Sequence, residues 1–385
     1  MNVGRTQTKL LILTALSMTV TAVTADAITH TVPIDPKVAP LLKRAASEIE
    51  LKQYDSAIRT YSEALQMKPD TTTAAAIHAS RAIAYRHKNN LDKAMADANE
   101  SIRLNPRYPG GYFQRAAISR GSGNLDQAIS SYDAAIRLNP NYAQSYYGRA
   151  IAYSQKGDYD QAIRDSTEAI RLQDKTMQSD FHYNRAIYYE TLGNFGKAIA
   201  DYDDAIRIAP NDLRNYGGRA HAFQEMGQLD KASGDYERAI RLNPTEPNDY
   251  RQRGFAYFAK GNYRAAASDY EKAARLSPSN YDAANSLAWF RATCPEESLR
   301  NGKEALETSL RLCGRTHGQD SDAVDTLAAA YAETGDFDNA VKYQTQALNM
   351  RGVHAFKRKR MQERLELYRQ HKPYRQESKF IAQRQ

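Results

Sequence analysis

An arginine recurs at the same position in seven successive segments of the chain, which could indicate either an anion-binding site or a structural role. The seven are Arg44, Arg81, Arg115, Arg149, Arg185, Arg219 and Arg253. A row of guanidinium groups could bind anions, because each group presents a planar set of donors to a carboxylate or phosphate. Five of the segments also carry an aspartate at one fixed place, namely Asp97, Asp165, Asp201, Asp235 and Asp269. We therefore favour Arg–Asp pairs between packed helices over an anion-binding row.

A second set of arginines falls in the last turn of predicted helices. Its members are Arg103, Arg137, Arg171, Arg207, Arg241 and Arg275. A cation at this end of a helix complements the helix dipole, which stabilises the helix by roughly 0.3–1 kcal/mol. The position of this set therefore requires no ligand.

Enzyme signatures are missing from the sequence. The glycines of 193–197 are too close together for a phosphate loop, and those of 121–123 lack the third glycine of a dinucleotide-binding turn. The eight histidines are scattered, with no HExxH motif and no close His/Asp cluster in the sequence. We predict a protein with no catalytic activity, no metal site and no cofactor.

Two cysteines, Cys294 and Cys313, would suggest a disulfide in an exported protein. They fall at a turn and near the far end of the helix that follows it. A helix of about a dozen residues spans roughly 18 Å, whereas a disulfide holds its two Cα atoms about 4.4 to 6.8 Å apart. We predict that both thiols are unpaired within one molecule.

The arginines lie within a pattern that repeats along the chain at a constant spacing. Pro106 and Pro140 have the same separation as Pro210 and Pro244, and as Pro244 and Pro278. An alanine stands twelve residues ahead of most of these segment ends, at positions 57, 94, 128, 162, 198, 232 and 266. With 42% hydrophobic and 25% charged residues, the composition is that of a folded chain.

This pattern resembles the tetratricopeptide repeat, which has a period of about 34 residues and a signature of small residues, aromatic residues, a glycine turn and a closing proline. The copy at 213–246 shows it in the residues Ala220, Phe223, Gly227, Leu229, Ala232, Tyr236, Ala239 and Pro244. The resemblance implies an all-α, right-handed superhelical solenoid of about nine antiparallel helix pairs. Small residues allow the two helices of a pair to approach closely, and aromatic residues fill the space between neighbouring pairs.

The repeats divide the chain into consecutive parts. Seven regular copies occupy 38–279, and two further copies occupy 280–350. Seventeen residues separate Ala288 from Ala305 in the eighth copy, where the regular copies have twelve, so we predict a long turn between its two helices.

The N-terminus has the features of a secretory signal peptide at 1–27, followed by a linker at 28–37. Arg5 and Lys9 precede an apolar run from Leu10 to Val23, and the segment Ala25-Asp26-Ala27 has the small-x-small pattern of a cleavage site. The run is shorter than the roughly 20 residues that span a bilayer, and no other stretch approaches a membrane span. We predict export to the periplasm, or secretion, with no transmembrane segment after cleavage.

The net charge of +8 resides almost entirely in the C-terminal segment 351–385, which has eleven Lys or Arg and three Glu. The repeats are close to neutral, which argues against nucleic acid as a partner despite a pI of about 9.2. Met361, Leu365 and Tyr368 are spaced as on one helix face. We predict a capping helix whose Lys and Arg face water, and as an alternative a contact with an anionic surface.

In the resembled family the first helices of the pairs line a concave groove. The resemblance places in this groove Phe113, Tyr147, Ile151, Tyr183, Ile187, His221, Arg251, Phe255 and Phe258. Family members that clamp acidic chaperone tails carry Lys and Asn where this chain has Tyr147 and Ile151, so that type of clamp is disfavoured. The predicted strip is apolar and aromatic, a surface suited to peptide segments with bulky side chains.

We therefore expect a scaffold in the cell envelope that binds other proteins or peptides. As an alternative, the chain is an accessory subunit that acts in trans in an envelope enzyme or polymer-export complex.

Overall fold

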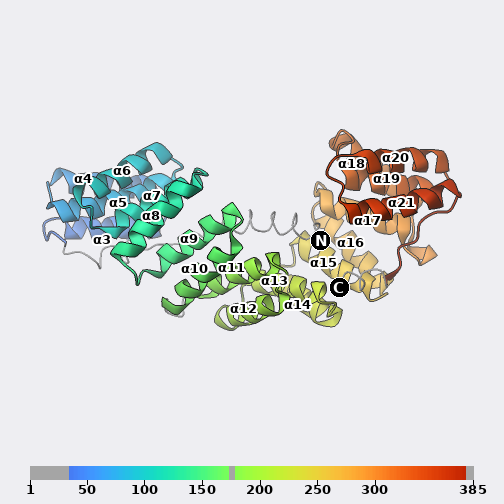
Figure 1. Cartoon of the computed structure of the whole chain (residues 1–385), viewed down its shortest axis with the longest axis horizontal. Coiled ribbons are helices and arrows are strands. Elements are labelled where there is room, and N and C mark those ends of the chain that lie inside the picture. Colours follow the sequence, from blue (N-terminus) through green and yellow to red (C-terminus); the bar gives the residue numbers. More distant parts are fainter. Residues whose placement is uncertain (1–33, 173–177, 379–385) are drawn as a thin grey trace. The chain divides into compact units, whose positions relative to one another are not determined.

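The structure is a computed structural model that describes residues 34–172 and 178–378. These residues form nineteen α-helices and one 3-10 helix, with no strand among them (Figure 1). The helices divide into two compact units, and the boundary between them in the chain falls between Ile208 and Ala209. The predicted signal peptide at 1–27 and most of the linker lie outside the described residues.

Unit 1 contains five antiparallel helix pairs, coloured blue to green in Figure 1. The first helices of these pairs are α3 (Ala39–Glu50), α5 (Thr71–His87), α7 (Pro109–Gly121), α9 (Ala143–Lys156) and α11 (Gln178–Thr191). Their second helices are α4 (Tyr54–Gln66), α6 (Leu91–Leu104), α8 (Leu125–Leu138), α10 (Tyr159–Leu172) and α12 (Phe195–Ile208).

Unit 2 contains four further pairs and a final single helix. The first helices are α13 (Leu213–Glu225), α15 (Pro247–Ala259), α17 (Tyr281–Thr293) and α19 (Ser321–Glu333). The second helices are α14 (Leu229–Leu242), α16 (Tyr263–Leu276), α18 (Gly302–Arg315) and α20 (Phe337–Asn349), and α21 (Ala355–Arg369) follows. Both units confirm the predicted all-α solenoid architecture of stacked helix pairs.

The residues at each turn explain why the chain changes direction there. Gly157 ends α9 with a φ of 85°, in the left-handed region that glycine enters without steric cost. Asn90, Asn124 and Asn262 each precede a second helix, and each side chain accepts a hydrogen bond from a backbone N–H of its first turn. Such caps satisfy donors that the helix itself leaves unpaired.

The core is a series of small clusters between neighbouring helices. Tyr132 of α8 is buried against Phe113 and Ala152, and the same α8 face meets Gly148 of the next pair. A Cβ atom at Gly148 would lie 2.5 Å from the Tyr132 ring, so only glycine permits this approach. Most of these clusters join one pair to its neighbour, so neighbouring pairs depend on each other for burial of their apolar edges.

The eighth pair has a long turn between its helices, at the position that the sequence indicates. The turn contains a 3-10 helix, η1 (Glu297–Leu299). Arg300 fixes the turn: its Nη1 donates to the carbonyl of Cys294 at 3.2 Å, and its Nε donates to Glu333 at 2.8 Å.

Helix α21 covers the end of unit 2. Met361, Leu365 and Tyr368 are buried and lie in clusters with residues of α19 and α20. The prediction that the Lys and Arg of this helix face water is wrong for Arg364. Its side chain is buried, and its Nη2 lies 2.7 Å from Asp325 of α19.

A return segment, residues 374–376, follows α21 and runs back to α17. The Tyr374 ring lies 6.0 Å from the Trp289 ring between centroids, and the backbone N–H of Gln376 donates to the carbonyl of Thr293 at 2.9 Å. Arg375 pairs with Glu333 at 2.6 Å. The return segment therefore contacts the eighth pair directly.

None of the helices in the described ranges combines the length and the apolar character that crossing a membrane requires.

Candidate functional site

Several first helices of successive pairs approach one another, and we call the surface that the first helices form within each unit the inner face. In unit 1 α5 contacts α7 and α7 contacts α9, and in unit 2 α15 contacts α17 and α17 contacts α19. Within the described ranges no two successive second helices show comparable contact. In a curved stack of helix pairs, the helices that lie closer to their successors are on the concave side. The first helices are therefore the elements that would face a partner held by the stack.

The predicted Arg–Asp pairs are present in five repeats. In each, the arginine of the first helix donates from Nε and Nη2 to the two carboxylate oxygens of the aspartate, with N···O distances of 2.7–2.8 Å. The pairs are Arg81–Asp97, Arg149–Asp165, Arg185–Asp201, Arg219–Asp235 and Arg253–Asp269. This bidentate geometry confirms the structural interpretation.

Several of these arginines also join one repeat to the preceding one. The Nη1 atom of Arg149 contacts Asp133 at 2.5 Å, and that of Arg185 contacts Thr167 at 2.8 Å. These arginines are therefore fully engaged and present no open row of donors to an anion.

The remaining two arginines of the row have other partners. Arg44 pairs with Glu48 of its own helix, and Arg115 donates to Ser131 at 3.0 Å, where the other repeats have aspartate.

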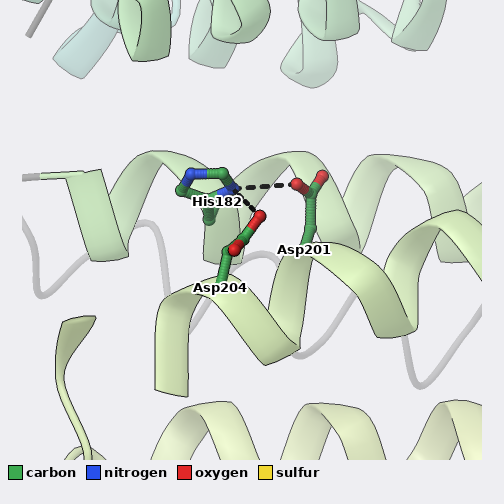
Figure 2. A group of neighbouring side chains, drawn as sticks. All are labelled: His182, Asp201 and Asp204. Carbon is green, nitrogen blue, oxygen red and sulfur yellow. Dashed lines mark hydrogen bonds and ion pairs between the residues drawn. The ribbon is translucent and has the colours of Figure 1, made fainter. Parts of the chain in front are cut away.

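A cluster of His182, Asp201 and Asp204 links α11 to α12, as Figure 2 shows. Nδ1 of His182 lies 2.9 Å from Asp201 and 3.9 Å from Asp204. The prediction that the histidines form no close His/Asp cluster is wrong here. The reason is topological: residues 19 apart come together across an antiparallel helix pair, and His78 likewise meets Asp97 at 2.7 Å.

These side chains do not fit a metal site. Both carboxylate oxygens of Asp201 already accept hydrogen bonds from Arg185, whose positive charge opposes a cation. The potential ligand atoms lie within 4.8 Å of one another, but Asp204 also pairs with Arg207 at 2.7 Å. We interpret the cluster as an extension of the Arg–Asp pair.

The histidines change how the paired carboxylates titrate. Burial alone would raise the pKa of Asp201, but hydrogen bonds from Arg185 and His182 outweigh burial and lower that pKa. Asp165 has no histidine beside it, and burial raises its pKa in spite of Arg149. His182 therefore acts as an additional donor that keeps its carboxylate charged.

Six of the nine predicted groove residues are buried. Phe113, Tyr147, Ile151, Tyr183, Ile187 and Phe258 are each less than a tenth exposed and pack against neighbouring helices. The Tyr147 and Phe181 ring centroids are 4.4 Å apart, and those of Phe258 and Phe290 are 6.1 Å apart. These six residues cannot form the exposed apolar strip that we predicted, because their side chains are buried against neighbouring helices.

The other three predicted residues, His221, Arg251 and Phe255, are partly exposed on the first helices of unit 2. A binding role for them remains a prediction. Arg251 donates to Asn248 of its own helix at 2.7 Å, and no ion pair of Arg251 is present among the described residues.

Two arginines that the sequence analysis did not single out lie on the inner face of unit 1. Arg86 on α5 and Arg120 on α7 occupy the same place in successive repeats. The Nε of each is buried and has no hydrogen-bond partner in the described part of the chain. Burial lowers the pKa of Arg86, and the charge of Arg120 lowers it further. An arginine that recurs in register without a matching acid was the signal that could have identified them.

Cys294 and Cys313 are both free. Burial raises the pKa of Cys313 to about 11 and also raises that of Cys294. At neutral pH both remain thiols, which are poor nucleophiles and poor metal ligands.

Comparison with protein families gives four matching models, described as tetratricopeptide repeat or TPR repeat. They match residues 42–109, 120–157, 147–212, 219–291 and 322–354. The gap between the last two ranges contains the long turn of the eighth pair.

Among curated proteins, serine/threonine-protein phosphatase 5 of Homo sapiens and of Rattus norvegicus are each 34% identical over 82 residues. The match covers 21% of this chain and 16% of each phosphatase. A match of this length supports the presence of the repeat and says nothing about the activity of the phosphatase.

Among solved structures, similarity extends to PilW, described as a type IV pilus biogenesis factor, with 17% identity and a TM-score of 0.50, covering 54% of this chain and 96% of PilW. YrrB, described as a TPR protein with an unusual peptide-binding site, is 22% identical with a TM-score of 0.43, covering 48% of this chain and 95% of YrrB. A repeat protein from Parabacteroides merdae is 20% identical with a TM-score of 0.46, covering 65% of this chain and 97% of that protein. At these identities the similarity concerns the fold alone.

Proposed function

Because the chain belongs to the tetratricopeptide-repeat superfamily, we propose that it is a scaffold that holds segments of other proteins against its inner face. The inner face carries this proposal. It is built from helices that approach one another, and it contains polar groups that the fold leaves unused. Arg86 on α5 and Arg120 on α7 carry two of them, since each side chain is partly exposed and its Nε has no partner in the described residues. A hydrogen-bonding group that the fold leaves unpaired on an accessible side chain is available to a bound partner.

The same proposal includes a location in the cell envelope. It is supported by the basic start, the apolar run and the small-x-small pattern of residues 1–27. An exported scaffold without catalytic groups of its own would act by bringing partners together.

The proposal is tested by locating where peptides bind. Peptides are selected from a displayed library on the mature chain, residues 28–385, and crosslinked to it through photoreactive phenylalanine at single positions. The inner positions are Gly121, which has open space around it at the end of α7, and Phe255 on α15. The matched outer positions are the exposed arginines Arg137 on α8 and Arg241 on α14.

We expect crosslinks from the inner positions and none from the outer ones. Crosslinking from the second helices alone, or a library that yields no binder, would contradict the proposal.

A further inference from the structure

Arg86 and Arg120 stand apart from the other arginines of the first helices. The arginines of the Arg–Asp pairs donate to carboxylates of the same repeat, whereas neither Arg86 nor Arg120 has a hydrogen bond or an ion pair among the residues that the structure describes. Both are partly exposed as residues while their Nε atoms are shut off from solvent. The terminal nitrogens are not among the buried atoms without partners, so they retain contact with solvent.

This arrangement costs folding free energy. A guanidinium that gives up part of its hydration without gaining an anion is destabilising, and arginine cannot escape the penalty by losing its proton. Two such groups on adjacent helices also repel each other, as the effect of Arg120 on the pKa of Arg86 shows. The same charge acts on Tyr188 of α11, where burial raises the pKa to about 12 while Arg120 works in the opposite direction. The inner face of unit 1 therefore carries positive charge that no acidic group of the described chain neutralises at these two sites.

Resting on the proposed scaffold function, we propose that Arg86 and Arg120 together bind the carboxylates of an acidic peptide segment that lies along the inner face of unit 1. Packed helices lie about 8–10 Å apart, and three residues of extended chain span about 10 Å. Two acidic side chains that are close in an extended peptide can therefore meet the two guanidinium groups in turn. A guanidinium binds a carboxylate through two parallel hydrogen bonds, which fixes the register of the peptide.

The surroundings favour a peptide over a long polyanion. The row of cations ends after two members, because the same register position on α9 is Ser154. A polymer with a charge on every unit requires an extended basic stripe. Tyr54 acts electrostatically on Arg86 and is partly exposed, so one aromatic ring near the charged pair is accessible. Such a ring suits an apolar part of a peptide.

The test measures binding of fluorescein-labelled hexaglutamate and hexaglutamine to the mature chain by fluorescence anisotropy. We expect hexaglutamate to bind and hexaglutamine to bind at least about tenfold more weakly, because charge-assisted hydrogen bonds are lost. Arg86→Gln and Arg120→Gln should each weaken hexaglutamate binding by about tenfold or more. Arg137→Gln removes the same charge from an exposed site on α8 and should change binding less than about twofold.

A second measurement separates binding from a structural role. If the two arginines serve binding, Arg86→Gln and Arg120→Gln leave the thermal unfolding midpoint unchanged or raise it. A lowered midpoint in both variants, as a structural arginine would give, overturns the proposal. So does failure of hexaglutamate to bind.

A competition arm identifies the source of the anion. Sodium phosphate or sodium acetate is added at constant ionic strength, and we expect neither to displace hexaglutamate at equal concentration. Displacement by phosphate at equal concentration would show that the site binds a free oxyanion, and it would overturn the proposal that its ligand is a peptide. If library peptides crosslink at the inner positions but keep their affinity in Arg86→Gln and Arg120→Gln, this inference fails while the scaffold function stands.

Discussion

Helix α5 carries two arginines five residues apart, Arg81 and Arg86, whose surroundings are opposite. Arg81 lies between α5 and α6, and it donates two hydrogen bonds to Asp97 and one to Ser62 of the preceding pair. Arg86 lies on the inner face, and its Nε has no partner in the described part of the chain. The same contrast separates Arg115 from Arg120 on α7, since only Arg115 finds a hydrogen-bonding side chain among the described residues. An arginine in this fold is structural where the neighbouring helix supplies an acceptor, and available for binding where it does not.

Among the arginines that have an acidic partner, we expect the largest effect at the most deeply buried pair, Arg364 and Asp325. Asp325→Ala leaves the guanidinium of Arg364 buried without its anion. We expect the free energy of unfolding to fall by about 3–5 kcal/mol, measured by urea denaturation of the mature chain. Asp322→Ala is the control. Asp322 lies on the same helix as Asp325 but is an exposed partner of Lys357, so its loss should lower the free energy of unfolding by less than about 1 kcal/mol. Equal losses in the two variants would show that burial does not govern the strength of these pairs.

Arg149 provides the next test, because its side chain contacts carboxylates in two consecutive repeats. Arg149→Ala leaves Asp165 buried without its cation. We expect a loss of about 2–3 kcal/mol in the free energy of unfolding by the same method, less than for Arg364 because Arg149 retains more exposure. Arg171→Ala breaks an exposed pair with Glu168 and should leave the free energy of unfolding nearly unchanged. A large loss at Arg171 would remove the distinction between buried and exposed pairs.

Asp249 on α15 extends the comparison to an unpaired acid. Its Oδ2 is buried and has no hydrogen-bond partner in the described residues, and burial, with a smaller effect of Glu246, raises its pKa to about 7. Between about pH 4 and pH 7 the carboxyl group of Asp249 is therefore protonated in the folded chain and ionised in the unfolded chain. Stability from this group is therefore fully present at low pH and is lost as the pH rises towards 7.

We expect the free energy of unfolding, relative to Asp249→Asn, to fall by about 2–3 kcal/mol between pH 5 and pH 8. The measurement is urea denaturation of both proteins at the two pH values. A difference that does not vary with pH would mean that Asp249 is charged in the folded state.

The sequence predicted the repeats because their residues are determined locally. Gly157 is required by a left-handed backbone, and Ala162 by the close approach of two helices, so both recur at fixed spacing. The Arg–Asp pairs were predictable for the same reason, since arginine and aspartate keep a constant separation across one helix pair. The all-α fold of stacked pairs follows directly from these positions.

The binding face was harder to predict, because family geometry tells which helix faces inwards but not how deeply each side chain is buried. Tyr147 and Phe181 pack against each other with tilted rings instead of facing outwards, a contact between different repeats that no local pattern encodes. Arg86 and Arg120 were overlooked because an unpaired residue is recognised only once all of its neighbours are known. The burial of Arg364 escaped prediction for a similar reason, as its partner Asp325 lies 39 residues away.

In a simple row of repeats each pair touches only the next, so the last pair frays first when the chain is heated or pulled. The return segment changes this order in unit 2, because Tyr374 and Gln376 pass the ninth pair and contact α17 of the eighth. The eighth pair, the ninth pair and α21 are thereby closed into a single ring of contacts. They should melt together as one cooperative block, because the return segment ties the last described helices to the eighth pair.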